Sequence, residues 1–218
     1  MARTKERWEQ RVERRSAAGV HGGSGEALLV DISPAQVVRQ FGLGAVTFSP
    51  RVPGGRLHAP TAGFLSAVGL PESKFFSPRL DLESERRLGI DHGPRVKAYF
   101  ARYGAECPPE AEGWEVIGGF LFALVAIAPE NGMIYAFSEG EPDPHLMHGD
   151  VSSLVHALMV LERGRAHYRG LDFDDDAGRG AVVARMRREI TSVDPTPFVD
   201  DEGEWPRLFE EIGLGMWG

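Results

Sequence analysis

The chain has little cysteine, with one in its 218 residues. This single thiol, Cys107, cannot form an internal disulfide, and it excludes zinc or iron–sulfur sites that need several cysteines. Low cysteine usage is typical of the reducing cytoplasm, and we expect the protein to be cytoplasmic. Cys107 is followed by two prolines, and we expect a free thiol in a loop rather than a nucleophile.

The chain also lacks long hydrophobic runs. The longest, residues 120–128, is far short of the roughly 20 apolar residues that span a bilayer. The charged N-terminus has no apolar segment of the kind found in signal peptides, so we expect no membrane association. The hydrophobic content of 42% is enough for one domain with extensions, which needs no disulfides.

Positive charge is scarce relative to negative charge. The chain has 24 Lys and Arg against 32 Asp and Glu, a formal net charge of −8. The balance is uneven, at +3 for residues 1–19, −4 for residues 20–169 and −7 for residues 170–218. An acidic body disfavours binding to nucleic acid or anionic membranes, and it favours a protein partner with a basic face.

Composition predicts three parts. Residues 1–25 are expected to be a charged N-terminal segment, helical over 3–15, that leads into a linker, because residues 17–25 hold four glycines. Residues 26–170 are the predicted main domain. Residues 171–218 are predicted to be an acidic helical extension that packs on the same domain.

Caps and apolar spacing predict several helices. Residues 33–36 (SPAQ) have the pattern of a capping box with proline in the first turn, and the helix that they start should end at Gly42. Asp150 is predicted to cap a longer helix, whose apolar residues keep helical spacing as far as Leu161. Shorter helices are predicted over residues 61–68, 181–190 and 206–212.

The middle of the chain has the pattern of β-strands. Asn131-Gly132 lies between two apolar runs and favours an antiparallel hairpin, because both residues tolerate positive φ. The Gly118-Gly119 pair is predicted to separate the first strand of this hairpin from one further strand before it. A helix, then strands, then helices again is the order of an α+β fold. The predicted strands are residues 114–117, 120–128 and 133–137.

Segments that resemble phosphate-binding or calcium-binding motifs lack the neighbouring residues or strands that these sites require. The glycines of residues 22–25 precede the first predicted strand, and no Gly-Lys-Ser or Gly-Lys-Thr occurs. Residues 172–176 (DFDDD) resemble the start of a calcium loop, but Ala177 and Val183 stand where glycine and glutamate are required.

Two histidines raise the possibility of a metal site. His145 and His148 lie three residues apart, but Pro144 and Gly149 break the helix that would bring them together, so we expect a polar loop that leads to the Asp150 cap. No nucleophile, base and orienting group can be assembled from the sequence. We therefore predict a protein that is not an enzyme and has no catalytic residues, no metal and no cofactor.

Partner-binding candidates come from acidic and aromatic residues. Glu139, Glu141 and Asp143 follow the predicted hairpin and could contact a basic partner. Phe75 and Phe76 follow a predicted helix end, and aromatic residues that stay exposed in an acidic field are natural binding hot spots. Burial in the core is the ordinary role of such residues. The same alternatives apply to three aromatic residues of the acidic tail: Trp205, Phe209 and Trp217.

Several of these segments together resemble a known family. Residues 64–71 (FLSAVGLP), the Phe75-Phe76 pair, residues 114–118 (WEVIG), the hairpin of residues 123–137 and the helix start at residues 150–154 (DVSSL) resemble the SUKH superfamily, and most of all its fourth group of immunity proteins. The resemblance covers roughly residues 35–170 and extends into the Trp205-Pro206 segment.

The resemblance implies an α+β fold with a central, mostly antiparallel sheet flanked by helices. It also implies a bacterial immunity protein, an antitoxin that binds and neutralises a polymorphic toxin such as a nuclease or a nucleic-acid deaminase. The alternative is an intracellular regulatory or scaffolding module without catalytic activity, because the SUKH fold also occurs in such proteins. The sequence leaves the oligomeric state open.

Overall fold

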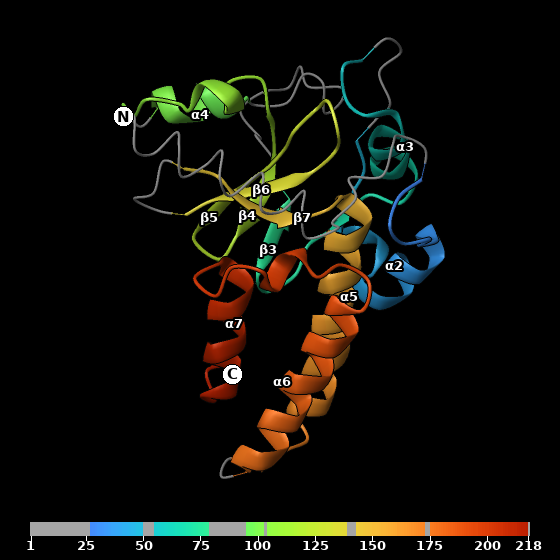
Figure 1. Ribbon diagram of the computed structural model, residues 1–218. Helices are drawn as coiled ribbons and strands as arrows, with labels where there is room; N and C mark the ends of the chain where they lie inside the picture. The colour runs from blue at the N-terminus through green and yellow to red at the C-terminus, as the bar shows by residue number, and fades with distance from the viewer. Residues whose placement is uncertain are drawn as a thin grey trace.

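A computed structural model describes residues 27–49, 55–78, 95–102, 104–138, 143–172 and 175–217. The predicted helix and linker of residues 1–25 lie outside these ranges. The predicted α+β class is confirmed, because a five-stranded antiparallel sheet is flanked by helices (Figure 1). The strand order is β3-β4-β5-β6-β7. The strands are β3 Phe76–Pro78, β4 Glu115–Phe120, β5 Ala123–Ile127, β6 Ile134–Phe137 and β7 His145–His148.

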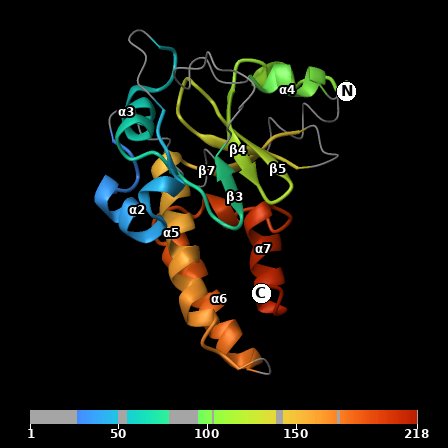
Figure 2. The same ribbon diagram turned by 180° about the vertical axis from the view of Figure 1, so that it is seen from behind.

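Helices cover both faces of the sheet. Figures 1 and 2 show α4 on one side and α5, α6 and α7 on the other. A small second sheet pairs β1 (Val46–Thr47) with β2 (Leu70–Pro71). The α-helices are α2 Pro34–Phe41, α3 Ala59–Ala67, α4 Val96–Arg102, α5 Val151–Tyr168, α6 Asp176–Thr191 and α7 Glu204–Gly213, and the 3₁₀ helices are η1 Leu43–Ala45, η3 Pro109–Ala111 and η4 Thr196–Phe198.

The apolar run of residues 120–128 does not alternate with polar residues because its strand, β5, is buried on both faces. Val125 and Ile127 point into the main core with the helices α5, α6 and α7. Leu124 and Ala126 point into a second, smaller core under α4. A strand that is buried on both faces reads as a continuous hydrophobic run, because neither face meets water.

The strongest local helix signals are confirmed. The Ser33 hydroxyl accepts the backbone N–H of Gln36, while the Gln36 side chain accepts the N–H of Ser33, which is the capping box predicted for α2. The Asp150 carboxylate accepts the N–H of Ser153 at 2.9 Å and caps α5. Helices are also present at the other three predicted places, and α6 begins at Asp176 rather than at residue 181.

The hairpin at Asn131-Gly132 is confirmed as the connection between β5 and β6. The two strands pair antiparallel, and Gly132 has φ +74°. The Asn131 side chain accepts the N–H of Met133 at 2.9 Å, which closes the turn locally.

The turn expected at Gly118-Gly119 is wrong. Both glycines lie inside β4, and the chain reverses at Leu121-Phe122. Gly118 instead allows β3 to approach β4 closely, because a Cβ at this position would lie 2.6 Å from the Ser77 carbonyl oxygen and 2.8 Å from the Phe76 ring. The neighbouring strand β3, which no sequence pattern predicts, therefore explains the glycine.

The loop expected at His145 and His148 is also corrected. Residues 145–148 form strand β7, in which His148 pairs with Ile134 and His145 pairs with Ala136 of β6. Backbone pairing with β6 decides this segment, since its own sequence has no strand pattern. The short helix α4 has no counterpart in the sequence analysis either.

The C-terminal helices share the core of the sheet. The main core includes residues from Ile32 to Trp217, among them Met186 of α6 and Trp205 of α7. The division of the chain at residues 25 and 170 stays a prediction. Within the described ranges, no helix has the length and apolar character needed to cross a bilayer.

We expect Gly118→Ala to lower the free energy of unfolding by about 1–3 kcal/mol, because the added methyl group must displace the β3 backbone or the Phe76 ring. Gly180→Ala in α6 is the matched control, because no atom lies within 4 Å of its added Cβ and alanine favours a helix. Urea unfolding of both variants checks this, and equal stability of the two would contradict the close approach.

Candidate partner-binding site

One end of the sheet brings together the β4–β5 turn and the strand ends that flank the predicted acidic segment. Strand β4 ends at Phe120 and β5 begins at Ala123, while β6 ends at Phe137 and β7 begins at His145. Because these neighbouring strands are antiparallel, the turn after β4, the end of β6 and the start of β7 lie at the same end. We call this end the loop end of the sheet.

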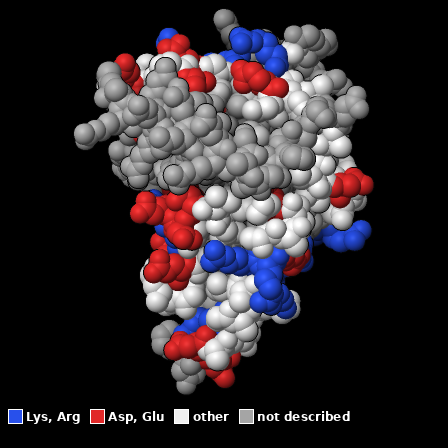
Figure 3. Space-filling model, in the orientation of Figure 1, with Lys and Arg blue, Asp and Glu red and all other residues white. Residues whose placement is uncertain are grey.

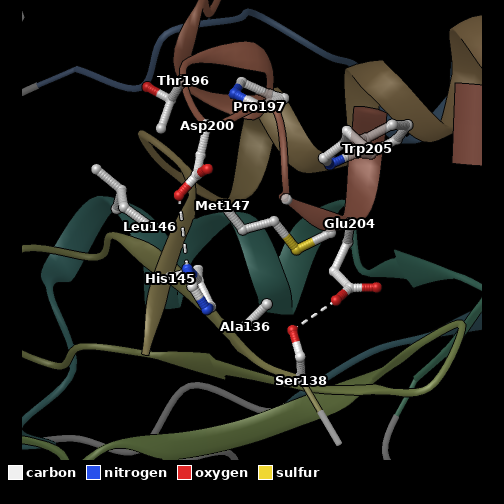
Figure 4. A pocket seen from close by; sticks show the side chains of 11 residues that line it. Ala136, Ser138, His145, Leu146, Met147, Thr196, Pro197, Asp200, Glu204 and Trp205 are labelled. Atoms are coloured by element: carbon white, nitrogen blue, oxygen red, sulfur yellow. Dashed lines mark hydrogen bonds and ion pairs between the residues drawn. The ribbon is translucent and has the colours of Figure 1, made fainter. Parts of the chain in front are cut away.

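The segment from η4 to the start of α7 lies against the loop end. The Ser138 hydroxyl donates to the Glu204 carboxylate at 2.6 Å, and His145 Nδ1 lies 3.7 Å from Asp200 Oδ2. Both ends of the loop that holds the predicted acidic residues are thus next to the acidic start of α7 (Figure 4).

A small hollow lies between these two segments. It is lined by the side chains of β6, β7, η4 and α7, with Met147, Pro197 and Trp205 among its apolar walls (Figure 4). Its cavity volume of about 20 Å³ is about the room for one water molecule, whereas pockets for small molecules take roughly 300–1,000 Å³. The hollow therefore does not offer a metabolite site.

A buried polar cluster fixes the segment before η4. Asp194 accepts the Ser153 hydroxyl at 2.7 Å and the backbone N–H groups of Gly149 and Thr196 at 2.8 and 2.9 Å. His148 is fully buried, and its Nδ1 lies 3.4 Å from Asp194 Oδ2. The cluster joins β7, the start of α5 and the end of α6.

This cluster contains Ser, His and Asp but does not have the geometry of a catalytic triad. In a triad the serine and the aspartate contact opposite nitrogens of the imidazole. Here Ser153 Oγ lies 3.2 Å from Nδ1 of His148, the same nitrogen that faces Asp194. All three side chains are buried, so the cluster stabilises the fold and presents no nucleophile to a substrate.

The environment of Asp194 makes its pKa lower than that of an ordinary carboxyl group. Burial alone would raise the pKa, but the hydrogen bond and charge of His148 lower it, and the N–H groups of Thr196 and Gly149 lower it further. The carboxylate is therefore ionised throughout the neutral range.

Cys107 matches the expectation of an unreactive thiol. It is a free, half-buried cysteine, and burial, together with the nearby Glu112 carboxylate, raises the pKa of its thiol. A raised pKa reduces the thiolate fraction at neutral pH. Among the residues that the structure describes, no group of three or more His, Cys, Asp or Glu side chains is placed to hold a metal ion.

The predicted binding residues fall in different places. Asp143 is exposed at the loop end, whereas Glu139 and Glu141 lie outside the described residues. Phe75 is half-buried, with its ring 6.2 Å from that of Trp217. Phe76 is 1% exposed, so its role as a partner contact is corrected to a core position between strands, out of a partner's reach. Trp205, Phe209 and Trp217 are also buried.

The structure adds surface residues that sequence reasoning missed. Phe122 at the β4–β5 turn is 84% exposed, but it lies inside an unbroken apolar run that gives no sign of a turn. Asp201 and Glu202 are exposed beside Asp200. Their position relative to β7 depends on the contact between Asp200 and His145, which are far apart in the chain, so no local signal could have found it.

Charge is segregated on the surface. In Figure 3, acidic side chains gather over α7 and the segment before it, whereas basic side chains gather over α6. Exposed acidic residues of this region are Asp201, Glu202, Glu210 and Glu211, and the exposed basic residues of α6 are Arg185, Arg187 and Arg188.

One known protein family matches the chain over most of its length. The family described as SUKH-4 immunity protein matches residues 32–211, which is most of the chain and includes β4 to β7, α6 and most of α7. No curated protein and no solved structure shows significant similarity to the chain.

We expect Asp194→Ala to lower the free energy of unfolding by about 3 kcal/mol at neutral pH, because it leaves the buried donors of Ser153, Gly149 and Thr196 without their acceptor. Since the folded protein lowers the pKa of Asp194, its contribution is complete above the ordinary pKa of about 4 and is lost as pH falls below it.

Urea unfolding of the wild type and Asp194→Asn between about pH 3 and about pH 7 measures this. The stability difference between the two should be largest near neutral pH and should shrink toward acid. A difference that stays constant with pH would contradict the assigned role of the carboxylate. Asp31→Asn is the control, because Asp31 is exposed.

Proposed function

The chain belongs to the SUKH-4 immunity protein family, and we propose that it acts as an immunity protein by binding and neutralising a toxin that acts on nucleic acid, a nuclease or a deaminase. The toxin presents a basic face, and the acidic loop end of the sheet covers it. We further propose that both proteins meet in the cytoplasm, where the nucleic acid target lies.

The observation that carries this proposal is the acidic surface at the loop end. Asp143, two residues before β7, is exposed, and the contact between His145 and Asp200 joins this strand to the segment that holds the exposed acidic residues Asp201 and Glu202. Within residues 194–217 seven acidic residues accompany one basic residue, Arg207.

Such a surface suits the active face of a nucleic-acid enzyme. Proteins that bind DNA or RNA use lysine and arginine to contact the phosphate backbone. Carboxylates that occupy those positions compete with the phosphates, and opposite charges steer the two proteins into rapid encounter. Occlusion needs no chemistry on the part of the immunity protein, which agrees with a one-water hollow and a buried polar cluster that serves the fold.

The contact residues that we propose are Glu139, Glu141 and Asp143. The described residues on either side of this segment contact the start of α7 and the residues before it, Ser138 with Glu204 and His145 with Asp200. Phe75 is a second proposed contact.

The test is co-expression with each toxin encoded beside the gene, followed by binding of a catalytically inactive form of that toxin. We expect survival of the cells and a complex that weakens between about 50 mM and about 500 mM salt, because screening shortens the reach of the charges. Death in every pairing, together with capture of a cellular protein instead, would replace the proposal with the regulatory or scaffolding module.

Combined Glu139→Lys, Glu141→Lys and Asp143→Lys should weaken binding at low salt by about tenfold or more and should flatten the salt dependence, mainly through slower association. Surface plasmon resonance at two salt concentrations measures both rates.

The matched control is combined Glu106→Lys, Glu110→Lys and Glu112→Lys, which makes the same charge change on exposed residues around η3, on the α4 side of the sheet. Equal weakening by both triple variants would mean that net charge, not this surface, determines binding.

A further inference from the structure

The β4–β5 turn presents an aromatic side chain to solvent. Phe122 is 84% exposed, the highest value among the large hydrophobic residues that the structure describes. Two-residue hairpin turns ordinarily hold Gly, Asn or Asp, because these residues adopt the required backbone angles easily. A leucine and a phenylalanine here need an explanation other than turn formation.

The backbone of the turn is strained. Leu121 has φ +52°, and within the described residues it is the one residue other than glycine with a positive φ. A branched side chain in this region carries an energetic cost, which persists when the surrounding structure holds the residue in place.

The surroundings do hold the turn. The Leu121 N–H donates to the Phe75 carbonyl oxygen at 2.9 Å, and the Leu121 side chain packs against the main core. The Phe120 ring, one residue earlier, lies 4.8 Å from the Trp205 ring. Phe122 therefore projects from a fixed base, and binding through it requires little ordering of the chain.

A second exposed apolar residue lies next in sequence to another ring that packs near the same tryptophan. The Trp205 ring lies 6.5 Å from the ring of Phe198, which precedes Val199. Val199 is 53% exposed and is followed directly by Asp200 and the exposed Asp201 and Glu202. Figures 1 and 2 both show the β4–β5 turn beside the start of α7. The surface thus combines exposed apolar side chains with acidic residues around them.

We propose that Phe122 is the apolar anchor of the toxin interface, inserting into an apolar pocket within the basic face of the toxin. This inference rests on the proposed function and adds the residue that holds the complex together. Hot spots of interfaces are large aromatic residues that become fully buried, surrounded by polar contacts that exclude water. The carboxylates speed association, and Phe122 slows dissociation.

The experiment measures binding of the catalytically inactive toxin encoded beside the gene to full-length Phe122→Ala, Phe122→Trp and Leu43→Ala. Leu43 on η1 is 66% exposed and is the matched control. We expect Phe122→Ala to raise the dissociation rate about 30-fold or more with an unchanged association rate and an unchanged salt dependence. Phe122→Trp should keep the dissociation rate within about threefold of the wild type, and Leu43→Ala should have no effect.

Three other outcomes would each contradict either the role of Phe122 or the proposed function. If the wild type binds and Phe122→Ala dissociates like Leu43→Ala, the anchor is wrong while the proposed function stands. If the wild type binds none of the neighbouring toxins, the proposed function fails and the anchor fails with it. If the free wild type self-associates in sedimentation and Phe122→Ala does not, the turn binds a second copy of the chain, and the inference is overturned. Thermal unfolding of each variant should match the wild type, because an exposed side chain contributes little to the core.

Discussion

The C-terminal half of the fold depends on one buried carboxylate. The Asp194 side chain is 4% exposed and accepts three hydrogen bonds from Ser153, Gly149 and Thr196. A buried charge is tolerated when its hydrogen-bonding capacity is used and a partner group lies near, as His148 does here. Because the donors come from the β7–α5 junction and from η4, the carboxylate fixes the direction in which the chain leaves α6.

That direction places Trp205 at the loop end of the sheet. Its indole is 1% exposed and lies among the rings of Phe120, His148 and Phe198. Packing around this residue joins β4, β7 and η4, which are distant in sequence. The acidic segment before α7 is thereby held against the end of β6 and the start of β7, through the contacts of Glu204 with Ser138 and of Asp200 with His145.

Charge and apolar contact would contribute differently at such a surface. Carboxylates such as Asp143 and Asp201 act over about the Debye length, roughly 8 Å at physiological salt, and so influence encounter before contact. An aromatic side chain such as Phe122 acts when water is excluded, and so influences how long a complex lasts. A turn that the core holds in place loses little chain entropy on binding, which favours a long-lived complex.

Helix caps and turns, which depend on interactions within a few residues, could be predicted from the sequence. The capping box at Ser33, the cap at Asp150 and the turn at Asn131-Gly132 are each decided by hydrogen bonds or backbone angles inside a short segment, and each is present in the structure. The acidic character of the tail is equally a property of composition.

The place of the β4–β5 turn was decided by the tertiary structure. The run of residues 120–128 has no turn residue, and Gly118 before it is required by the Phe76 ring and the Ser77 backbone rather than by a turn. Pairing with β6 made a strand of residues 145–148, and the fold brought Asp200 to His145 and left Phe122 exposed. Caps and turns depend on neighbours in sequence, whereas a binding surface depends on which distant segments pack together, and only the folded chain determines that.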